Sequence, residues 1–316
     1  MINLSLNPHV YSDVIVASIR SHFEGSTSKY VTYPKFVFLC GKGYEAGKYD
    51  VSNRGVTGRF LKKLLPDTHI VLSEKLWEER FDGDIDLLIF EEFLAEISDA
   101  IILFVESPGS FCELGTFAYA DDLFGDKLII VLDEKYRNSK SFISTGPVLK
   151  AKKDNSQVLY APIDNGAILS SRELRTSLEN LVKNMQSKRG SCNFRKINTS
   201  RDCVYINSFI IEILELLRLA QPIDSNQLLT LYKKVKNFDA FTFVKRDGSR
   251  FKREIQFSYI LKLLETAGII SHRPDGNLLF PDYKKAPNFM LDYRGKALER
   301  ERNRILCKKY QYGDPV

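Results

Sequence analysis

The stretch Ala100–Thr116, with the sequence AIILFVESPGSFCELGT, decides the fold. Its first six residues are all apolar, which predicts a strand buried on both faces, as in a parallel sheet. The Ser-Pro-Gly-Ser that follows predicts a tight turn into a helix. Ligands of open α/β sheets bind outside the carboxyl ends of the strands. We therefore expect this turn to lie at a ligand site.

Short apolar runs of the same character flank this stretch and predict the other strands, at Phe36–Cys40, His69–Leu72, Lys127–Leu132 and Val158–Ala161. Helical spacing of apolar residues predicts helices between and around them, at 54–65, 84–97 and 170–185. An amphipathic segment at 8–23 is a candidate cover for a sheet face, whereas 137–155 is polar and predicts a loop overhanging the sheet. Residues 1–190 are thus predicted to form an α/β domain, a Rossmann-like parallel sheet with helices on both faces.

The last third of the chain predicts a second, mainly α domain after a polar linker candidate at 186–200. One helix is predicted at 206–219, a second begins after the capping residue Asp224, and a third spans 254–267. A predicted hairpin at 269–280 follows them. Three helices and then a hairpin is the element order of a winged helix-turn-helix. We expect residues 200–316 to form such a domain, which docks nucleic acid or a protein partner.

Charge is distributed unevenly between these two parts. Residues 1–200 hold 25 Lys and Arg against 26 Asp and Glu, while residues 201–316 hold 21 against 14. This basic excess suits a nucleic acid or another polyanion, and it suits a solvated basic surface equally well. The candidate nucleic-acid contacts surround an Asp247-Gly248 turn and are Lys245, Arg246, Arg250, Lys252 and Arg253.

Composition excludes several classes of protein. The chain is 44% hydrophobic and 27% charged, as in an ordinary globular protein. It shows neither a run of roughly 18 apolar residues nor the pattern of a signal peptide, so we expect a cytoplasmic protein with no membrane association. The five cysteines are scattered and only four histidines occur. Neither disulfides nor a metal site is therefore predicted.

Two glutamates, Glu106 and Glu113, bracket the turn after the central apolar run. Carboxylates near a ligand sugar can stabilise or trap the oxocarbenium-like transition state of glycosidic cleavage, so both are candidate catalytic residues. An ordinary strand-end residue and a partner of the helix dipole would give the same pattern. In the same turn, Ser107, Gly109 and Ser110 would allow close approach of a ligand and place an anionic group at a helix N-terminus.

A second glycine turn, CGKGY, contains Gly41 and Gly43 and follows the first predicted strand. It lies where nucleotide-binding folds cradle phosphates, although it matches neither the dinucleotide-binding fingerprint nor the P-loop. Arg54 and Arg59 are candidate phosphate partners or members of a solvated helix face. Asp99, just ahead of the central run, is a candidate ligand for a ribose or base, or a turn cap.

The Glu-Ser-Pro-Gly-Ser and Glu-Leu-Gly of the central stretch resemble the signature of the nucleoside 2-deoxyribosyltransferase-like N-glycosidases. The whole chain resembles effector toxins of bacterial anti-phage retrons of type II-A. The resemblance implies that Glu113 is the nucleophile, that Asp99 binds the base and that Gly41 and Gly43 form the first glycine turn. The family's orienting Asp is replaced here, and the nearest position is Ser107 or Glu106. The choice of main carboxylate between Glu106 and Glu113 stays open.

The resemblance also implies a function. Such an effector is held inactive by the retron reverse transcriptase and its multicopy single-stranded DNA with its RNA, and it depletes a nucleotide on infection. NAD, cleaved at the nicotinamide-ribose bond, is the expected substrate, and no cofactor is expected. Assembly into a homo-oligomer or filament would suit a toxin that needs an off state. One alternative is a deoxyribosyltransferase or hydrolase of free nucleosides or nucleotides. The other is a non-catalytic, nucleotide-sensing DNA-binding regulator.

Overall fold

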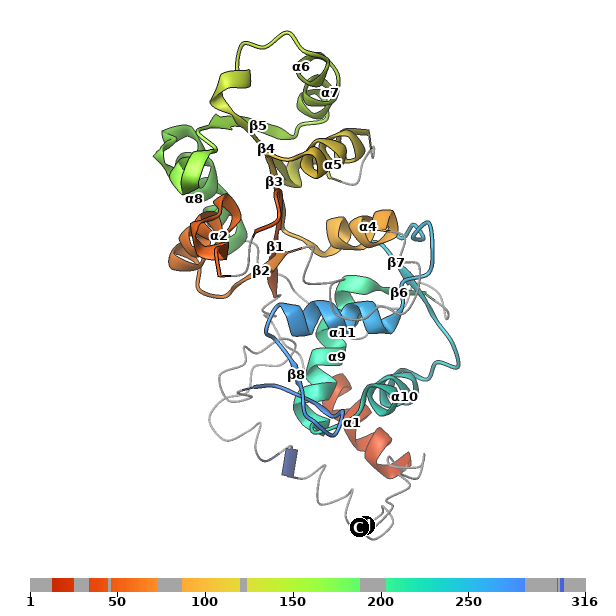
Figure 1. Ribbon diagram of the computed structural model, residues 1–316. Coiled ribbons are helices and arrows are strands. Elements are labelled where there is room, and N and C mark those ends of the chain that lie inside the picture. Colours follow the sequence, from red (N-terminus) through yellow and green to blue (C-terminus); the bar gives the residue numbers. More distant parts are fainter. Residues whose placement is uncertain are drawn as a thin grey trace. The chain divides into compact units, whose positions relative to one another are not determined.

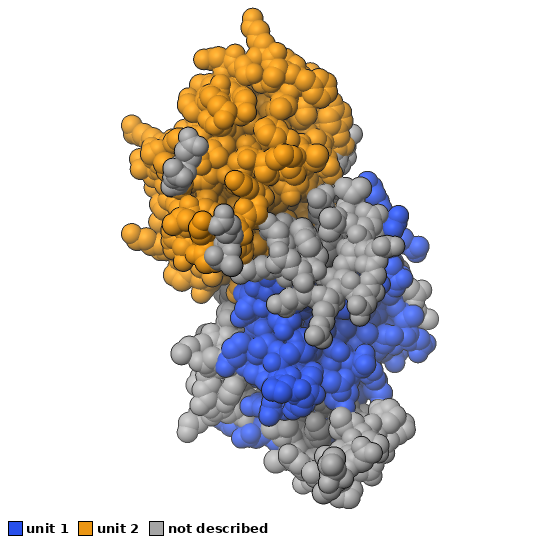
Figure 2. All heavy atoms as spheres, viewed as in Figure 1, with its two compact units in different colours: residues 1–33, 189–316 blue, residues 34–188 orange. Residues whose placement is uncertain are grey.

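The computed structural model describes residues 13–25, 34–44, 47–72, 87–119, 124–187, 203–281, 300 and 302–303. The chain divides into two compact units (Figure 2). We call residues 34–188 the sheet unit, and residues 1–33 with 189–316 the helical unit. The expected limits, 1–190 and 200–316, differ from this division because the first 33 residues group with the C-terminal part. Most of the linker candidate, 186–200, lies outside the described residues.

The sheet unit is built on a five-stranded parallel sheet in the order β2-β1-β3-β4-β5 (Figure 1). Its strands are β1 (Lys35–Cys40), β2 (Thr68–Leu72), β3 (Ala100–Val105), β4 (Leu128–Asp133) and β5 (Gln157–Ala161). All six residues of β3 are buried, as expected for a strand covered on both faces. The predicted α/β class and Rossmann-like parallel sheet are confirmed.

Helices cover both faces of this sheet, with α2 and α8 on one side and α4 and α5 on the other (Figure 1). The helices are α2 (Asn53–Leu64), α4 (Leu87–Ile97), α5 (Pro108–Tyr119), α6 (Phe142–Thr145), α7 (Pro147–Lys153) and α8 (Arg172–Ser187). Single 3-10 turns are η1 (Tyr49–Val51), η2 (Gly125–Lys127) and η3 (Glu134–Tyr136), and η4 (Asp164–Ser170) is longer. Leu61 of α2 and Leu178 of α8 are fully buried in one core with Leu39 and Ile102 of the sheet.

The loop predicted at 137–155 is wrong, because α6 and α7 occupy it. Ser141 caps α6 by accepting a hydrogen bond from the Ser144 amide, and Pro147 lies at the start of α7, where its missing N–H costs nothing. Val148 and Ala151 are buried although the segment is polar on average. A four-residue helix with no buried residue, followed by one short helix with a single buried face, gives too weak a periodicity to predict helices against that background.

The helical unit contains α1 (Asp13–Gly25), α9 (Ile206–Ala220), α10 (Ser225–Lys236) and α11 (Phe257–Thr266). Its short strands are β6 (Cys203–Tyr205), β7 (Thr242–Val244), β8 (Ser271–His272) and β9 (Leu278–Leu279). Asp224 caps α10 through the Gln227 amide at 2.9 Å, as predicted. Antiparallel pairing of β8 with β9 confirms the predicted hairpin, whereas parallel pairing of β6 with β7 was not predicted.

The helix α1 belongs to the helical unit and packs against α10 there, so its role as a cover for a sheet face is not confirmed. Arg20 donates from Nε to the Val235 carbonyl at 2.9 Å and from Nη2 to the Lys234 carbonyl at 2.7 Å. These carbonyls lie in the last turn of α10, where a helix cannot satisfy its own acceptors. An amphipathic pattern specifies an apolar face, but it does not specify which apolar partner that face meets.

A buried charge cluster joins α9 to α10 in the helical unit. Glu212 is 1% exposed, and it accepts hydrogen bonds from the Tyr232 hydroxyl at 2.7 Å and from Lys236 Nζ at 2.9 Å. Burial and the neighbouring carboxylate raise the pKa of Tyr232 well above its ordinary value. The cluster is therefore a fixed crosslink between the two helices.

Across the described parts of both units, no helix is long and apolar enough to span a membrane.

Candidate functional site

The strand order reverses between β1 and β3, because β2 lies on one side of β1 and β3 on the other. Chain segments that leave β1 and β3 therefore diverge. Ligands of open α/β sheets bind in a crevice outside the carboxyl ends of such strands, so we call this region the crevice. Gly41 follows β1 directly and Glu106 follows β3 directly. The fold thus brings together the two turns that the sequence marks as candidate ligand contacts.

Glu106 is held at this point by hydrogen bonds to both of its carboxyl oxygens. Its Oε1 accepts from the Lys42 amide at 3.2 Å, and its Oε2 accepts from Asn53 Nδ2 at 2.6 Å. Burial raises the pKa of Glu106, although these two hydrogen bonds and the nearby charges of Arg54 and Lys42 act in the opposite direction. The result is a partly desolvated carboxylate with a defined orientation.

Gly41 allows this close packing. Its φ of +150° is one that side-chain-bearing residues rarely adopt, and a Cβ there would lie 3.1 Å from Glu106 Oε1 and 3.1 Å from the Phe104 carbonyl oxygen. Gly43 differs, because a Cβ on it would meet no atom within 4 Å. Of the two predicted glycines, Gly41 contacts the carboxylate and Gly43 lies on the open side of the turn.

Asn53 was not among the residues selected from the sequence. It lies at the first position of α2, after the N-cap Ser52, whose side chain accepts from the Gly55 amide at 3.0 Å. Asn53 is 4% exposed, and its Nδ2 also donates to the Ile163 carbonyl, which follows β5, at 2.8 Å. A Ser-Asn pair ahead of a helical pattern is typical of an ordinary cap, so no separate signal in the sequence pointed to this contact.

The two arginines of α2 have different environments. Arg54 is fully buried, and its Nη2 donates to the Lys42 carbonyl at 2.7 Å while its guanidinium lies 5.4 Å from the centre of the Tyr44 ring. Arg54 therefore supports the first glycine turn. Arg59 is exposed and pairs with Asp50 at 2.7 Å, which places it on the solvated face that the sequence left as its alternative.

Ser107 and Ser110 build the turn between β3 and α5. The Oγ of Ser110 accepts from the amides of Glu106 at 2.9 Å and Ser107 at 2.8 Å, and it donates to the Ser107 carbonyl at 2.8 Å. One donor and two acceptors are the full capacity of a hydroxyl. Ser110 is 1% exposed, so it shapes the turn, while Gly109 is exposed beside it.

Glu113 lies in the second turn of α5 and is half-buried. At about 100° per residue it lies about 60° around the helix from Ser110 and about 40° from Phe117, both of which are buried. Glu113 is therefore on the flank of the buried face of α5. Glu106, by contrast, lies directly at the crevice between β1 and β3.

Asp99 lies at the opposite edge of the sheet. Its Oδ2 accepts from the Phe36 amide at 3.2 Å, and its own amide donates to the Phe36 carbonyl at 2.9 Å. The six residues of β3 separate Asp99 from Glu106, which corresponds to about 20 Å. The structure does not bring Asp99 to the crevice, and it shows the capping role that the sequence left as its alternative.

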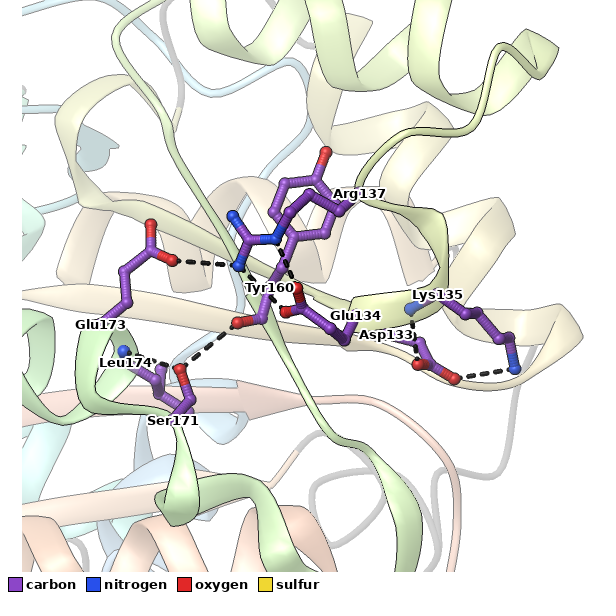
Figure 3. Close-up of polar contacts among 8 residues, drawn as sticks. All are labelled: Asp133, Glu134, Lys135, Arg137, Tyr160, Ser171, Glu173 and Leu174. Carbon is purple, nitrogen blue, oxygen red and sulfur yellow. Dashed lines mark hydrogen bonds and ion pairs between the residues drawn. The ribbon is translucent and has the colours of Figure 1, made fainter.

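An exposed ion-pair cluster follows β4 and β5 at the carboxyl edge (Figure 3). Arg137 donates to both carboxyl oxygens of Glu134, at 2.5 and 2.9 Å, and to Glu173 at 3.3 Å. Its guanidinium lies 4.8 Å from the centre of the Tyr160 ring. Hydrogen bonding to Arg137 lowers the pKa of Glu134, so this carboxyl stays ionised and paired. These contacts link the segment after β4 to β5 and to α8.

The predicted basic turn is present in the helical unit. The Gly248 amide donates to the Lys245 carbonyl at 2.9 Å, and Gly248 has a φ of +84°. Lys245 is half-buried, with its Nζ 5.9 Å from the centre of the Phe251 ring. The exposed cations of the turn are Arg246, Arg250, Lys252 and Arg253. The turn therefore presents positive charge to the solvent.

Within the described ranges, no group of three or more His, Cys, Asp or Glu side chains could hold a metal ion.

Fold and site together define a class: a Rossmann-like α/β protein with a carboxylate fixed at the switch point of its sheet. The chain belongs to the family described as "STM3845 retron effector protein", whose model matches residues 50–272.

Two curated relatives from Escherichia coli are similar to part of the chain. "Retron Ec86 putative ribosyltransferase/DNA-binding protein" is 41% identical over 127 residues, which cover 38% of this chain and 38% of the relative. "Retron Ec73 putative ribosyltransferase/DNA-binding protein" is 39% identical over 127 residues, which cover 39% of each chain. The chain thus spans 38% and 39% of the length of these relatives.

Proposed function

We propose that this retron effector is an N-glycosidase whose sheet unit cleaves NAD into nicotinamide and ADP-ribose. The observation that carries the proposal is the Glu106 carboxylate, fixed by Lys42 and Asn53 at the switch point between β1 and β3. The word "ribosyltransferase" in the names of both relatives supports chemistry at a ribosyl carbon. As in retron effectors of type II-A, the outcome would be NAD depletion in the infected cell.

The chemistry requires a negative charge beside the anomeric carbon. When the bond from the ribose C1′ to the nicotinamide nitrogen breaks, the electron pair leaves with nicotinamide and positive charge develops on the ribose. Ionised Glu106 stabilises or captures this cation, and its partial desolvation strengthens the attraction. Water then bonds to C1′ and loses a proton, which gives ADP-ribose. Nicotinamide leaves as a neutral molecule, so the leaving group needs no proton.

The remaining site residues are assigned around this carboxylate. We place the ribose and phosphates against the two turns, where Gly41, Gly43, Gly109 and Ser107 leave room for close approach. Glu113, on the flank of α5, is the second carboxylate, and it contacts the sugar or the attacking water. Glu106 is the main carboxylate in this proposal because it lies directly at the crevice.

The helical unit is proposed to hold the effector in its inactive state. Its helices and the β8–β9 hairpin would form a winged helix-turn-helix, and the exposed cations of the 245–253 turn would contact the multicopy single-stranded DNA with its RNA or the retron reverse transcriptase. The words "DNA-binding" in the names of the relatives support a nucleic-acid partner. A homo-oligomer or filament is part of the same proposal for the assembled complex.

Product analysis tests the enzymatic proposal. The purified full chain is incubated with NAD, alone and with the reverse transcriptase and its DNA, and released nicotinamide is measured by chromatography. We expect release by the free chain, suppression by the complex, and loss of release in Glu106→Gln and Glu113→Gln variants. Release of purine or pyrimidine bases from a nucleoside panel, with NAD left intact, would overturn the substrate. Tight binding of duplex DNA without any turnover would favour a regulator.

A further inference from the structure

Consecutive residues at the start of α2 hold Glu106 from two sides. Asn53 reaches Oε2 directly, with Nδ2 at 2.6 Å. Arg54 Nη2 donates to the Lys42 carbonyl at 2.7 Å. The amide of Lys42 in turn donates to Glu106 Oε1 at 3.2 Å. Both residues are buried, at 4% and 0% exposure, so neither is free to rearrange in solvent.

The orientation of the Asn53 amide is fixed by its partners. Nδ2 has two acceptors, Glu106 Oε2 and the Ile163 carbonyl, so a flipped amide would place its oxygen against both of them. In the observed orientation, Oδ1 is buried and has no hydrogen-bond partner within the described residues. A buried unsatisfied oxygen destabilises the fold, and its retention here points to a role in function.

We propose that Asn53 and Arg54 are positioning residues for Glu106, with Asn53 orienting Oε2 directly and Arg54 orienting Oε1 through Lys42. The inference rests on the proposed glycosidase activity and deepens it by naming the residues that aim the carboxylate. Neither residue needs to contact the substrate. This role differs from the phosphate contact expected of Arg54, because its buried guanidinium donates to the glycine turn.

A positioning role predicts a change in how Glu106 titrates. The Asn53 hydrogen bond lowers the pKa of Glu106, whereas burial raises it. Loss of this hydrogen bond should therefore raise the pKa of Glu106 further. The charged groups that also lower this pKa are Arg54 on α2 and Lys42 after β1, and both remain in an Asn53 variant. The acidic limb of the rate profile should therefore move to higher pH when Asn53 is replaced.

The test measures NAD cleavage by the full chain across pH in Asn53→Asp and Asn53→Ala variants. Asn53→Asp keeps the shape of the side chain and places a like charge beside Glu106, so it changes the electrostatics without opening a cavity. We expect kcat near neutral pH to fall by about 10-fold to 100-fold, the scale of one hydrogen bond to a charged group. KM should change little, and the acidic limb should move upward in both variants.

Thr57→Val is the matched control, because Thr57 is fully buried one turn further along α2 and its Oγ1 has no partner in the described part of the chain. Its rate profile should match that of the unsubstituted protein. A folded Asn53→Asp variant with an unshifted limb and normal kcat would overturn the inference. If Asn53→Asp does not fold, the Asn53→Ala and Arg54→Lys variants decide, through kcat near neutral pH and the position of the acidic limb. Absence of NAD cleavage by the unsubstituted chain would instead overturn the proposed function.

Discussion

At the scale of single residues, the site depends on an approach of two backbones that only glycine permits. In Gly41→Ala, the new Cβ would lie 3.1 Å from Glu106 Oε1 at an unfavourable φ. We expect loss of at least about 10-fold in NAD cleavage, because small displacements of a reacting group cost up to about 100-fold. Backbone strain should also lower the free energy of unfolding by about 1–3 kcal/mol.

The control for Gly41→Ala is Gly115→Ala in α5, where a Cβ would meet nothing within 4 Å. Alanine favours a helix over glycine, so this variant should unfold at slightly higher denaturant concentration. Denaturation curves and nicotinamide release, measured on both variants, check the pair. Equal activity losses in the two would contradict the steric explanation.

The raised pKa of Glu106 has a consequence for stability. In the folded protein this carboxyl keeps its proton to higher pH than in the unfolded chain. Its contribution to the stability of the fold therefore decreases as pH rises from the ordinary carboxyl range through the pKa of the folded state. Glu106→Gln keeps an acceptor for Asn53 and removes the partly buried charge. Its amide nitrogen cannot accept from the Lys42 amide, but that donor is exposed and can bond to water. We therefore expect the variant to be more stable than the unsubstituted protein at neutral pH, and inactive.

Thermal unfolding across pH checks this expectation. The stability gain of Glu106→Gln should be largest above the folded pKa and should shrink as the solution is acidified and Glu106 takes up its proton. A variant that is less stable than the parent at neutral pH would show that the charge of Glu106 stabilises the fold.

At the scale of elements, the turn between β3 and α5 depends on Ser110. Its hydroxyl is the acceptor for the amides of Glu106 and Ser107, so Ser110→Ala leaves two partly buried donors without their partner. We expect a loss of about 1–3 kcal/mol in unfolding free energy, and lower NAD cleavage because the Glu106 backbone is released. Cys112→Ala, on the exposed side of the same helix, should change neither quantity. Equal effects of the two substitutions would contradict this role for Ser110.

The elements of the sheet could be predicted because each strand is a short apolar run that both faces bury, and the observed strands agree with the predicted ones within one residue at each end. The crevice could be predicted from the turns that hold Gly41 and Glu106. Asn53 could not, because its role depends on the end of β3, distant in sequence and adjacent only after folding. The partner of α1 was missed for the same reason.

At the scale of the whole molecule, the sheet unit is inserted in the sequence of the helical unit, between residues 33 and 189. The helical unit therefore combines α1 with the C-terminal helices, and Arg20 joins them by two hydrogen bonds to the last turn of α10. Hydrogen bonds to charged groups contribute about 1.5–3 kcal/mol. We expect Arg20→Gln to lower the free energy of unfolding of the helical unit by about this amount.

Hydrogen exchange monitored by mass spectrometry locates the effect. Amides of α9 and α10 should exchange faster in Arg20→Gln, whereas those of β3 and β4 should keep their rates, because local stability differs between cooperative units. Arg273→Gln is the control in the same unit: its exposed side chain lies 3.7 Å from Asp275, and such a pair contributes little. Faster exchange in β3 to the same degree would mean that the two units unfold as one, and that binding at the helical unit acts on the stability of the site itself.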